Sequence, residues 1–412
     1  HVMLGAVFAG ALCGMVGMGY LGDLVGRRRA LLLTLSFTVV GALGTALAPW
    51  GDASTIYGVI CAFRFILGVG VGGKFPLSAV TAAEGARGDE HVSTRVGWAF
   101  FWQTPGAMAP YVVGIILFVH NVSEWMTNLQ FRLVFGLGAV PAAIVMWAEY
   151  HSHESRKFVH ARTRSPLQEA LAHPEYWRTL LGTGGTWLLY DISYYGTAIF
   201  TPQILASIFG NEDSLFSQYW QSIVVTAVGV PSAISGILLL RPRGPNWLIH
   251  AGAKFLDFWG FIFIALSFGS LATAYQVCPD GCQWLKFSLF ILVTFSINWG
   301  PNIATFVLPT SSFPVQVRAT FNGLSATMAK LGAVAGTFMY EPISDRWGVA
   351  TVLWTQTVLA LLGVVVTVVC IDNEQVTGAT SINEVGDDQV DETPIGGDLS
   401  PLLHPGPERE TA

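Results

Sequence analysis

Eleven stretches of roughly 20 apolar residues limit what this chain can fold into, because a helix needs about that many residues to cross the hydrocarbon core of a bilayer. These stretches lie at 1–21, 30–49, 56–84, 96–119, 129–149, 179–203, 217–240, 246–274, 284–309, 317–340 and 347–371. Only 12% of the 412 residues are charged and 52% are apolar. A water-soluble domain of this length needs more charge to cover its surface. We therefore predict an all-α integral membrane protein that crosses the bilayer many times.

The longest hydrophilic interior segment, 150–178, divides these stretches into five and six. A chain of two pseudo-symmetric six-helix halves that has lost its first helix would have this pattern. We therefore expect an N-terminal transmembrane half at 1–149, a cytoplasmic linker at 150–178 and a C-terminal transmembrane half at 179–371. The segment 372–412 is rich in Gly, Pro, Asp, Glu and Thr, and we expect a disordered tail there. Since the chain begins with His1 inside an apolar run, we also expect a further piece to precede it.

Loop arginines and lysines orient the spans, because cytoplasmic loops carry an excess of them. Most of these residues, beginning with Arg27, Arg28 and Arg29, fall on the side of the 150–178 linker. That side is therefore predicted to be cytoplasmic and to hold the tail, and we expect the protein in the plasma membrane. The opposite side holds the possible glycosylation sequon Asn121-Val-Ser123 and the loop from Cys278 to Cys282, where a disulfide could persist.

Asp191 is an acid near the middle of a predicted span, where an ionisable side chain needs a partner or a function. Trp187 and Tyr195 lie four residues before and after it, so the three side chains share one helix face. Such a stripe could line a polar cavity in which the acid takes up and releases a proton. The alternative is an acid that is simply satisfied by neighbours in the core.

Two lysines within predicted spans come from opposite halves of the chain. Lys330 has small neighbours, and Lys74 follows a glycine-rich run and precedes Pro76, which predicts an interruption of the helix. Two cations at an interface between repeats are typical of an anion site. The amides Gln103 and Asn302, the latter beside a Gly-Pro break, either contribute to such a site or bond to a neighbouring helix.

The segment Gly19-Tyr-Leu-Gly-Asp23-Leu-Val-Gly26-Arg27-Arg28 resembles the motif between the second and third helices of the major facilitator superfamily. The resemblance implies the two-half major facilitator fold, with 11 helices visible of 12 expected in the full-length protein. It also implies that the motif residues belong to a cytoplasmic gate and are not substrate ligands; they are Gly19, Asp23, Gly26, Arg27 and Arg28.

Further segments resemble the phosphate:proton symporters of fungi and plants. They are Gly72-Gly-Lys-Phe-Pro-Leu-Ser-Ala79, Leu181 to Tyr195, Asn298-Trp-Gly-Pro-Asn-Ile-Ala-Thr-Phe306, and Phe313 to Ala326 running on to Lys330. In that family phosphate lies between the halves. The positions matching its ligands are Gln103, Trp187, Asp191, Tyr195, Asn302 and Lys330.

The chain departs from that family at Lys74-Phe75, where the family usually has Asp-Tyr. The resemblance implies that the family's Asp carries a coupling proton and that its Tyr touches the substrate. The family's Glu before Phe-Pro is Ser312 here. These changes bear on proton coupling and on substrate choice.

We therefore predict a secondary transporter, not an enzyme, that moves inorganic phosphate by alternating access with proton coupling through Asp191. Lys330 and Lys74 would offset the anion's charge, and no metal, cofactor or nucleic acid is expected. The expected partners are the phosphate anion, protons and the lipid bilayer, and the expected state is a monomer. One alternative is an uncoupled transporter or exchanger of an organic phosphate or another small anion, and a second is a non-transporting anion sensor.

Overall fold

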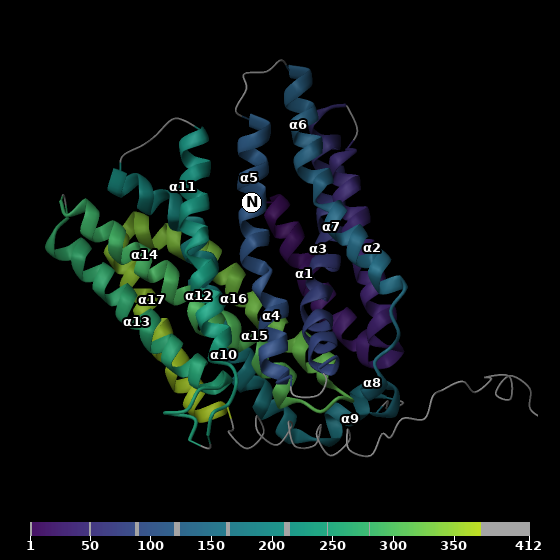
Figure 1. Cartoon of the computed structure of the whole chain (residues 1–412). Coiled ribbons are helices and arrows are strands. Elements are labelled where there is room, and N and C mark those ends of the chain that lie inside the picture. The colour runs from purple at the N-terminus through teal and green to yellow at the C-terminus, as the bar shows by residue number, and fades with distance from the viewer. Residues whose placement is uncertain are drawn as a thin grey trace, which may run out of the picture.

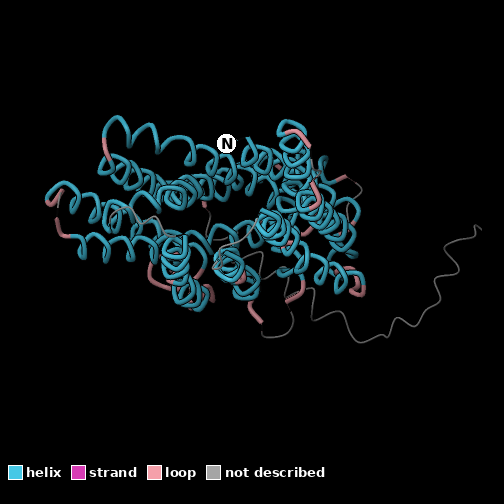
Figure 2. The backbone as a smooth tube through the Cα atoms, turned by 90° about the horizontal axis from the view of Figure 1, so that it is seen from above, coloured by secondary structure: helices cyan, strands magenta, loops and turns pink. Residues whose placement is uncertain are grey.

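The computed structural model describes residues 2–48, 51–86, 90–118, 124–161, 165–209, 215–244, 246–279 and 281–371. The predicted tail 372–412 and the sequon at 121–123 lie outside the described residues. The described chain is helical throughout and contains no strand, which confirms the all-α prediction. Figure 2 shows these helices in cyan, joined by loops in pink.

The helices divide into those before and those after residue 173. The first set is α1 (Val2–Val25), α2 (Arg27–Ala46), α3 (Ala53–Glu84), α4 (Val92–Phe101), α5 (Gln103–Phe118), α6 (Glu124–Leu137), α7 (Ala139–Tyr150), α8 (Arg156–Ala161) and α9 (Pro166–Ala172). The second set is α10 (Pro174–Phe209), α11 (Leu215–Ala227), α12 (Gly229–Leu238), α13 (Ala253–Val277), α14 (Gln283–Trp299), α15 (Pro301–Ser312), α16 (Arg318–Trp347) and α17 (Val349–Cys370).

Nine spans within the described residues are long and apolar enough to cross a membrane. Several of them join two consecutive helices, as α4 and α5 do over Val92–Leu117. The remaining two of the eleven predicted spans fall within α10 and α16, which are 36 and 30 residues long but lie outside the apolar set. These two helices carry Asp191 and Lys330, the charges on which the predicted site depends.

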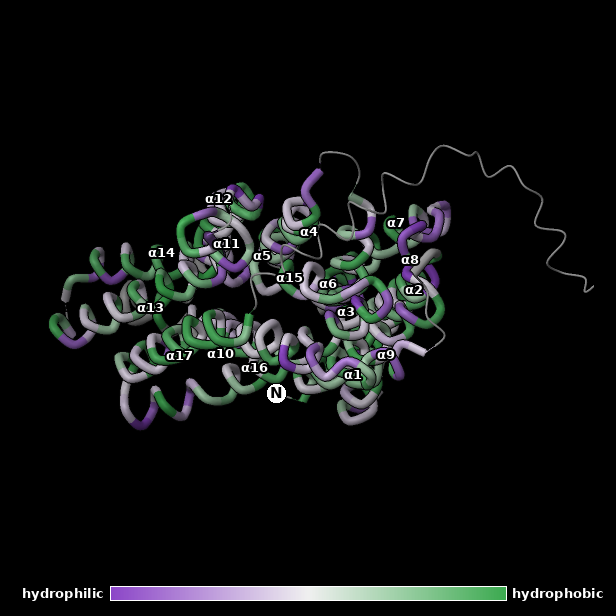
Figure 3. The backbone as a smooth tube through the Cα atoms, turned by 90° about the horizontal axis from the view of Figure 1, so that it is seen from below, coloured by the Kyte–Doolittle hydropathy of each residue, from purple (hydrophilic) through white to green (hydrophobic). Residues whose placement is uncertain are grey.

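Figure 1 shows α1 to α7 gathered on one side of the bundle and α10 to α17 on the other, with α8 and α9 at one end. We call the end where α8 and α9 lie the linker end. In Figure 3 hydrophobic segments run along most of the helices, while hydrophilic positions gather around α8. The two sides meet where α1 packs against α16 and where α4 packs against α15.

Proline has different effects in two helices near the middle of the bundle. Gly300 ends α14 and also precedes α15, which Pro301 begins, so the predicted break beside Asn302 is present. By contrast, α3 continues through Pro76, and the interruption predicted there is wrong. Proline removes only one backbone donor, and packed neighbouring helices let a membrane helix tolerate that loss.

Cys278 and Cys282 are joined by a disulfide that spans the turn between α13 and α14. Both residues lie in the short loop that the sequence predicts to be on the side opposite the linker. The bond therefore agrees with the expectation that this loop can hold a disulfide.

Candidate functional site

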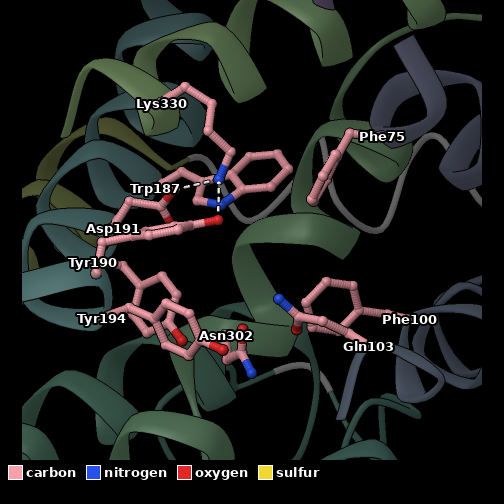
Figure 4. Close-up of a pocket in the computed structure, with 10 residues that line it drawn as sticks. Phe75, Phe100, Gln103, Trp187, Tyr190, Asp191, Tyr194, Asn302 and Lys330 are labelled. Carbon is pink, nitrogen blue, oxygen red and sulfur yellow. Dashed lines mark hydrogen bonds and ion pairs between the residues drawn. The ribbon is translucent and has the colours of Figure 1, made fainter. Parts of the chain in front are cut away.

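A pocket lies among six helices drawn from both sides of the bundle (Figure 4). Helix α10 supplies five of its lining residues, and α3, α4, α5, α15 and α16 supply one each. The lining residues are Phe75, Phe100, Gln103, Trp187, Tyr190, Asp191, Tyr194, Tyr195, Asn302 and Lys330. Since α3, α4 and α5 meet α10, α15 and α16 here, a ligand in this pocket would contact both sides of the bundle.

A buried ion pair lies at one end of the pocket. The Lys330 ammonium is 3.0 Å from the Asp191 carboxylate, and the two residues are only 6% and 3% exposed. The same ammonium donates a hydrogen bond to the Tyr195 hydroxyl at 2.7 Å and lies 4.2 Å from the centre of that ring. Because the acid neutralises the lysine in this state, an anion that binds Lys330 must compete with Asp191.

Two glycines bring α16 close enough to α10 for this pair to form. A Cβ atom added at Gly332 would meet the backbone of Leu188, and one added at Gly336 would meet the backbone of Ile192. Small residues four apart allow membrane helices to approach backbone to backbone. Lys330 lies just before this contact on α16 and reaches across to Asp191.

Aromatic rings form the wall beside the ion pair. The Phe75 ring is 6.4 Å from both Trp187 and Phe306, and Phe306 is 4.6 Å from Phe100, centre to centre. The Lys330 ammonium lies 5.2 Å from the centre of the Phe75 ring. These rings come from α3, α4, α10 and α15, so they exclude water where the two sides of the bundle meet.

Neutral polar groups occupy the other part of the pocket. Figure 4 shows Tyr190 and Tyr194 on the side of Asp191 where Asn302 lies, away from Lys330. The Asn302 amide donates a hydrogen bond to the Asn298 side chain at 3.3 Å. The Tyr190 hydroxyl and one amide oxygen of Gln103 are buried and have no hydrogen-bond partner among the described residues.

Six of the seven substrate-contact residues predicted from the sequence therefore line one pocket. Lys74 is not among the lining residues. Cβ atoms added at Gly72 and Gly73 would meet Ala11 and Met18 of α1. Because successive side chains on a helix are turned by about 100°, the half-buried Lys74 points away from those contacts. It has no ion pair or hydrogen bond within the described chain, so its predicted role stays a prediction.

The sequence analysis did not assign four lining residues to the site: Phe75, which it noted only as a departure beside Lys74, and Phe100, Tyr190 and Tyr194. Tyr190 and Tyr194 are four residues apart and lie one position before Asp191 and Tyr195, so they form a second stripe beside the predicted one. Two tyrosines four residues apart inside an apolar span are the sequence pattern from which this second stripe could have been predicted. Phe100 carries no comparable signal, because phenylalanine is common in every span.

The gating-motif residues lie at the linker end, where α1 meets α16. The Asp23 carboxylate accepts hydrogen bonds from the backbone of Ala319 at 3.2 Å and from the backbone and hydroxyl of Thr320, both at 2.6 Å. It thereby satisfies free N–H groups at the start of α16, where a negative charge is favourable. The Arg27 guanidinium pairs with the same carboxylate at 2.9 Å.

Arg27 extends this network to two further parts of the chain. It donates to the Glu84 carboxylate of α3 at 2.9 and 3.1 Å and to the Val315 carbonyl oxygen at 2.7 Å. Its guanidinium also lies 4.3 Å from the centre of the Phe158 ring of α8. The network therefore joins the two sides of the bundle and the linker at one buried arginine.

The remaining motif residues adjoin this network. A Cβ atom added at Gly19 would come within 2.6 Å of the Ala319 carbonyl oxygen, so a larger residue would push α1 and α16 apart. Gly26 precedes α2 with a φ of 114°, a conformation that favours glycine. Arg28 donates to the Glu149 carbonyl oxygen at 3.2 Å.

The described residues contain no group of three His, Cys, Asp or Glu side chains that could hold a metal ion. The described residues that line the pocket include one acid and no histidine or cysteine, which is a poor set of metal ligands. Its chemistry is suited to an anion that carries hydrogen-bond acceptors.

Comparisons with known proteins agree with this architecture. The family described as Major Facilitator Superfamily matches residues 1–337. "Inorganic phosphate transporter PT2" of Toxoplasma gondii is 39% identical over 364 residues, which cover 87% of this chain and 62% of that protein. "Probable inorganic phosphate transporter 1-6" of Arabidopsis thaliana is 25% identical over 420 residues, which cover 88% and 80%. The chain thus spans less than two thirds of the Toxoplasma relative.

A proton:xylose symporter of the major facilitator superfamily, solved with 6-bromo-6-deoxy-D-glucose, has a similar structure. The TM-score is 0.70 at 17% sequence identity, and the match covers 88% of this chain and 84% of the symporter. At this identity the likeness demonstrates the fold alone.

Proposed function

The chain belongs to the major facilitator superfamily of membrane transporters, and we propose that it moves inorganic phosphate across a membrane by alternating access. The two relatives named as inorganic phosphate transporters support this choice of substrate. The observation that carries the proposal is the buried pair of Lys330 and Asp191 in a pocket between the two sides of the bundle. A phosphate ion there would bind Lys330 and take hydrogen bonds from the neutral donors around it.

The place of Asp191 beside Lys330 supports proton coupling as part of this proposal. Phosphate and an ionised Asp191 repel one another and compete for the same ammonium group. Protonation of Asp191 removes both effects, so phosphate and a proton would bind together. Release of the proton would restore the ion pair and expel the anion. This order of events makes Asp191 the coupling residue.

Lys74 remains in the proposal as a second cation, because it lies next to Phe75 of the pocket wall on α3. Its half-buried ammonium would lower the energy of an anion entering from that side. Replacing it with glutamine should raise the KM for phosphate if it acts in this way. An unchanged KM in that variant would remove Lys74 from the proposed site.

Alternating access requires the contacts at the linker end to break and re-form. In this conformation Arg27 bonds to Val315, which lies between α15 and α16, and Asp23 bonds to Ala319 and Thr320 in the first turn of α16. We propose that these contacts hold the linker end closed and that their release exposes the pocket to that side. The linker, the tail 372–412 and this gate would face the cytoplasm, in a monomer that resides in the plasma membrane.

Uptake of radiolabelled phosphate into proteoliposomes tests the proposal. The full-length protein is reconstituted and assayed with and without an imposed inward proton gradient, and empty liposomes serve as the control. Accumulation driven by the gradient is the expected result. Phosphate uptake that is the same with and without the proton gradient would refute proton coupling and favour a uniporter or exchanger.

Competition then tests the substrate. Unlabelled inorganic phosphate should inhibit uptake more strongly than glycerol 3-phosphate or a dicarboxylate at the same concentration. Stronger inhibition by an organic phosphate would assign that class as the substrate. Absence of phosphate uptake by a folded, reconstituted sample would refute the proposed function.

A further inference from the structure

We infer that Tyr190 is a further substrate-contact residue, whose phenol donates a hydrogen bond to an oxygen of the bound phosphate. This inference rests on the proposed function and names a contact that the ion pair alone does not provide. It begins from a buried hydroxyl group that has no hydrogen-bond partner among the described residues.

Tyr190 is 2% exposed, and its hydroxyl has no hydrogen-bond partner among the described residues. Buried hydroxyl groups almost always have a partner, because leaving one unsatisfied destabilises the folded protein. The ring is held in place 5.7 Å from the ring of Tyr194, in the cluster of buried residues that includes Phe261 and Leu353. The side chain is therefore well packed, and its polar end is what lacks a contact.

The unsatisfied hydroxyl belongs to a residue that lines the pocket. In Figure 4 Tyr190 lies beside Asp191 and on the same side as Tyr194 and Asn302. A ligand that binds Lys330 and extends toward Asn302 would therefore pass Tyr190. Among the residues that the structure describes, the packed core around the ring offers the hydroxyl group no polar atom within bonding distance.

Phosphate requires more donors than the ion-pair end of the pocket supplies. At neutral pH it carries between one and two negative charges on oxygen atoms that accept hydrogen bonds. The described residues that line the pocket include one cation, Lys330, which already pairs with Asp191. The opposite wall has no hydroxyl group at Phe75. A neutral phenol donor adds affinity without adding charge, which suits a site that must also release the anion.

The phenol of Tyr195 differs from that of Tyr190, because it already accepts a hydrogen bond from Lys330. The Tyr195 hydroxyl can therefore turn toward a ligand only if its bond to Lys330, the cation of the ion pair, breaks. Tyr190 has no such bond to break, so its hydroxyl is free to bond the ligand on entry. This difference assigns Tyr190 to anion contact and not to the charge network.

The test uses Tyr190→Phe, which removes one oxygen atom and keeps the ring. Tyr340→Phe is the matched control, because Tyr340 is another buried phenol, packed with Ile192 and Val352 outside the pocket lining. Thermal unfolding of the purified full-length proteins is followed with increasing inorganic phosphate, and uptake gives KM and maximal rate.

For Tyr190→Phe we expect phosphate affinity to fall by about tenfold or more, as for loss of a hydrogen bond to a charged ligand. The KM should rise correspondingly with little change in maximal rate. Without phosphate the variant should unfold at the wild-type temperature or higher, because an unsatisfied hydroxyl has been removed. Tyr340→Phe should keep the wild-type affinity and KM.

Unchanged phosphate affinity in folded Tyr190→Phe would overturn the inference, as would a loss of stability without a change in affinity. If Tyr190→Phe does not fold, Tyr190→Leu is measured in the same way, and the same outcomes decide. A wild-type protein that neither binds nor transports phosphate would instead overturn the proposed function, and this inference with it. The wild-type measurement therefore separates the two failures.

Discussion

Replacement of Lys330 by methionine is the sharpest test of the buried pair. Lys330→Met keeps a long, flexible side chain but leaves the Asp191 carboxylate, 3% exposed, without its cation. Removing one partner of a buried pair typically lowers the free energy of unfolding by about 3–5 kcal/mol. The size of the effect follows from how Asp191 responds.

The unpaired acid can avoid a buried charge only by binding a proton. With an ordinary aspartate pKa of about 3.9, holding that proton at pH 7 costs about 4 kcal/mol, and at pH 5.5 about 2 kcal/mol. The loss of stability should therefore be about 3–4 kcal/mol at neutral pH and shrink as the pH falls. The free energy of unfolding of the variant falls as pH rises, because folded Asp191 keeps its proton whereas the unfolded chain releases it above the ordinary pKa.

Thermal unfolding in detergent at about pH 7 and about pH 5.5 measures this effect. At roughly 1.2 °C per kcal/mol for a chain of 412 residues, Lys330→Met should unfold about 4–5 °C below wild type at neutral pH. The double variant Lys330→Met with Asp191→Asn is the control, because it removes both charges. It should recover most of the lost stability but should not bind phosphate.

Two outcomes would refute this reasoning. One is a Lys330→Met protein that unfolds at the wild-type temperature at neutral pH, which would mean that Asp191 is not buried beside it. The other is a double variant as unstable as the single one, which would assign the loss to packing and not to charge.

Three further predictions follow from the same contacts. Asp191→Asn should abolish phosphate accumulation driven by a proton gradient but retain phosphate exchange, as measured in proteoliposomes. Gly332→Ala should lower the free energy of unfolding by about 1–3 kcal/mol, because its Cβ would meet the Leu188 backbone of α10. Asp23→Asn removes the carboxylate charge at the start of α16 and should open the linker end about tenfold more often. Faster maleimide labelling from that side of Thr327→Cys, a partly buried position one turn before Lys330 on α16, would measure this opening.

Each of these predictions has a result that contradicts it. Asp191→Asn with the wild-type pH dependence of accumulation would exclude this acid from coupling. Gly17→Ala is the control for Gly332→Ala, because an added Cβ there meets nothing within 4 Å, and equal losses in both variants would refute the packing argument. Labelling of Thr327→Cys at the same rate with Asp23 or Asn at position 23 would show that this carboxylate does not hold the end closed.

Much of the candidate site could be predicted from the sequence of single helices. Trp187, Asp191 and Tyr195 share a face because they are four residues apart, and the structure has all three in one pocket. The amide Asn302 was marked by the adjacent Gly-Pro break, which separates α14 from α15. Such local features depend only on helix geometry and on proline, so one stretch of sequence suffices to predict them.

Contacts between residues of different helices could not be predicted from the sequence in this way. Lys74 and Lys330 looked equivalent in the sequence, as single cations among small residues in opposite halves. The structure pairs Lys330 with Asp191 across 139 positions and leaves Lys74 outside the pocket lining. The rotation of a membrane helix about its axis is set by packing against its neighbours. Close backbone contacts at Gly332 and Gly336 position α16 against α10, whereas close contacts at Gly72 and Gly73 position α3 against α1.

The sequence by itself determined that this chain is a bundle of membrane helices with few buried charges. Polar groups are costly inside a bilayer, so each span must be long and apolar, and both properties can be read from one stretch of sequence. Only the tertiary structure decided that Asp191 is neutralised by Lys330, that Asp23 caps α16, and that Tyr190 lines the pocket with a hydroxyl group that no described residue bonds. Those facts depend on which helix faces meet, and that is decided by the packing of side chains far apart in the sequence.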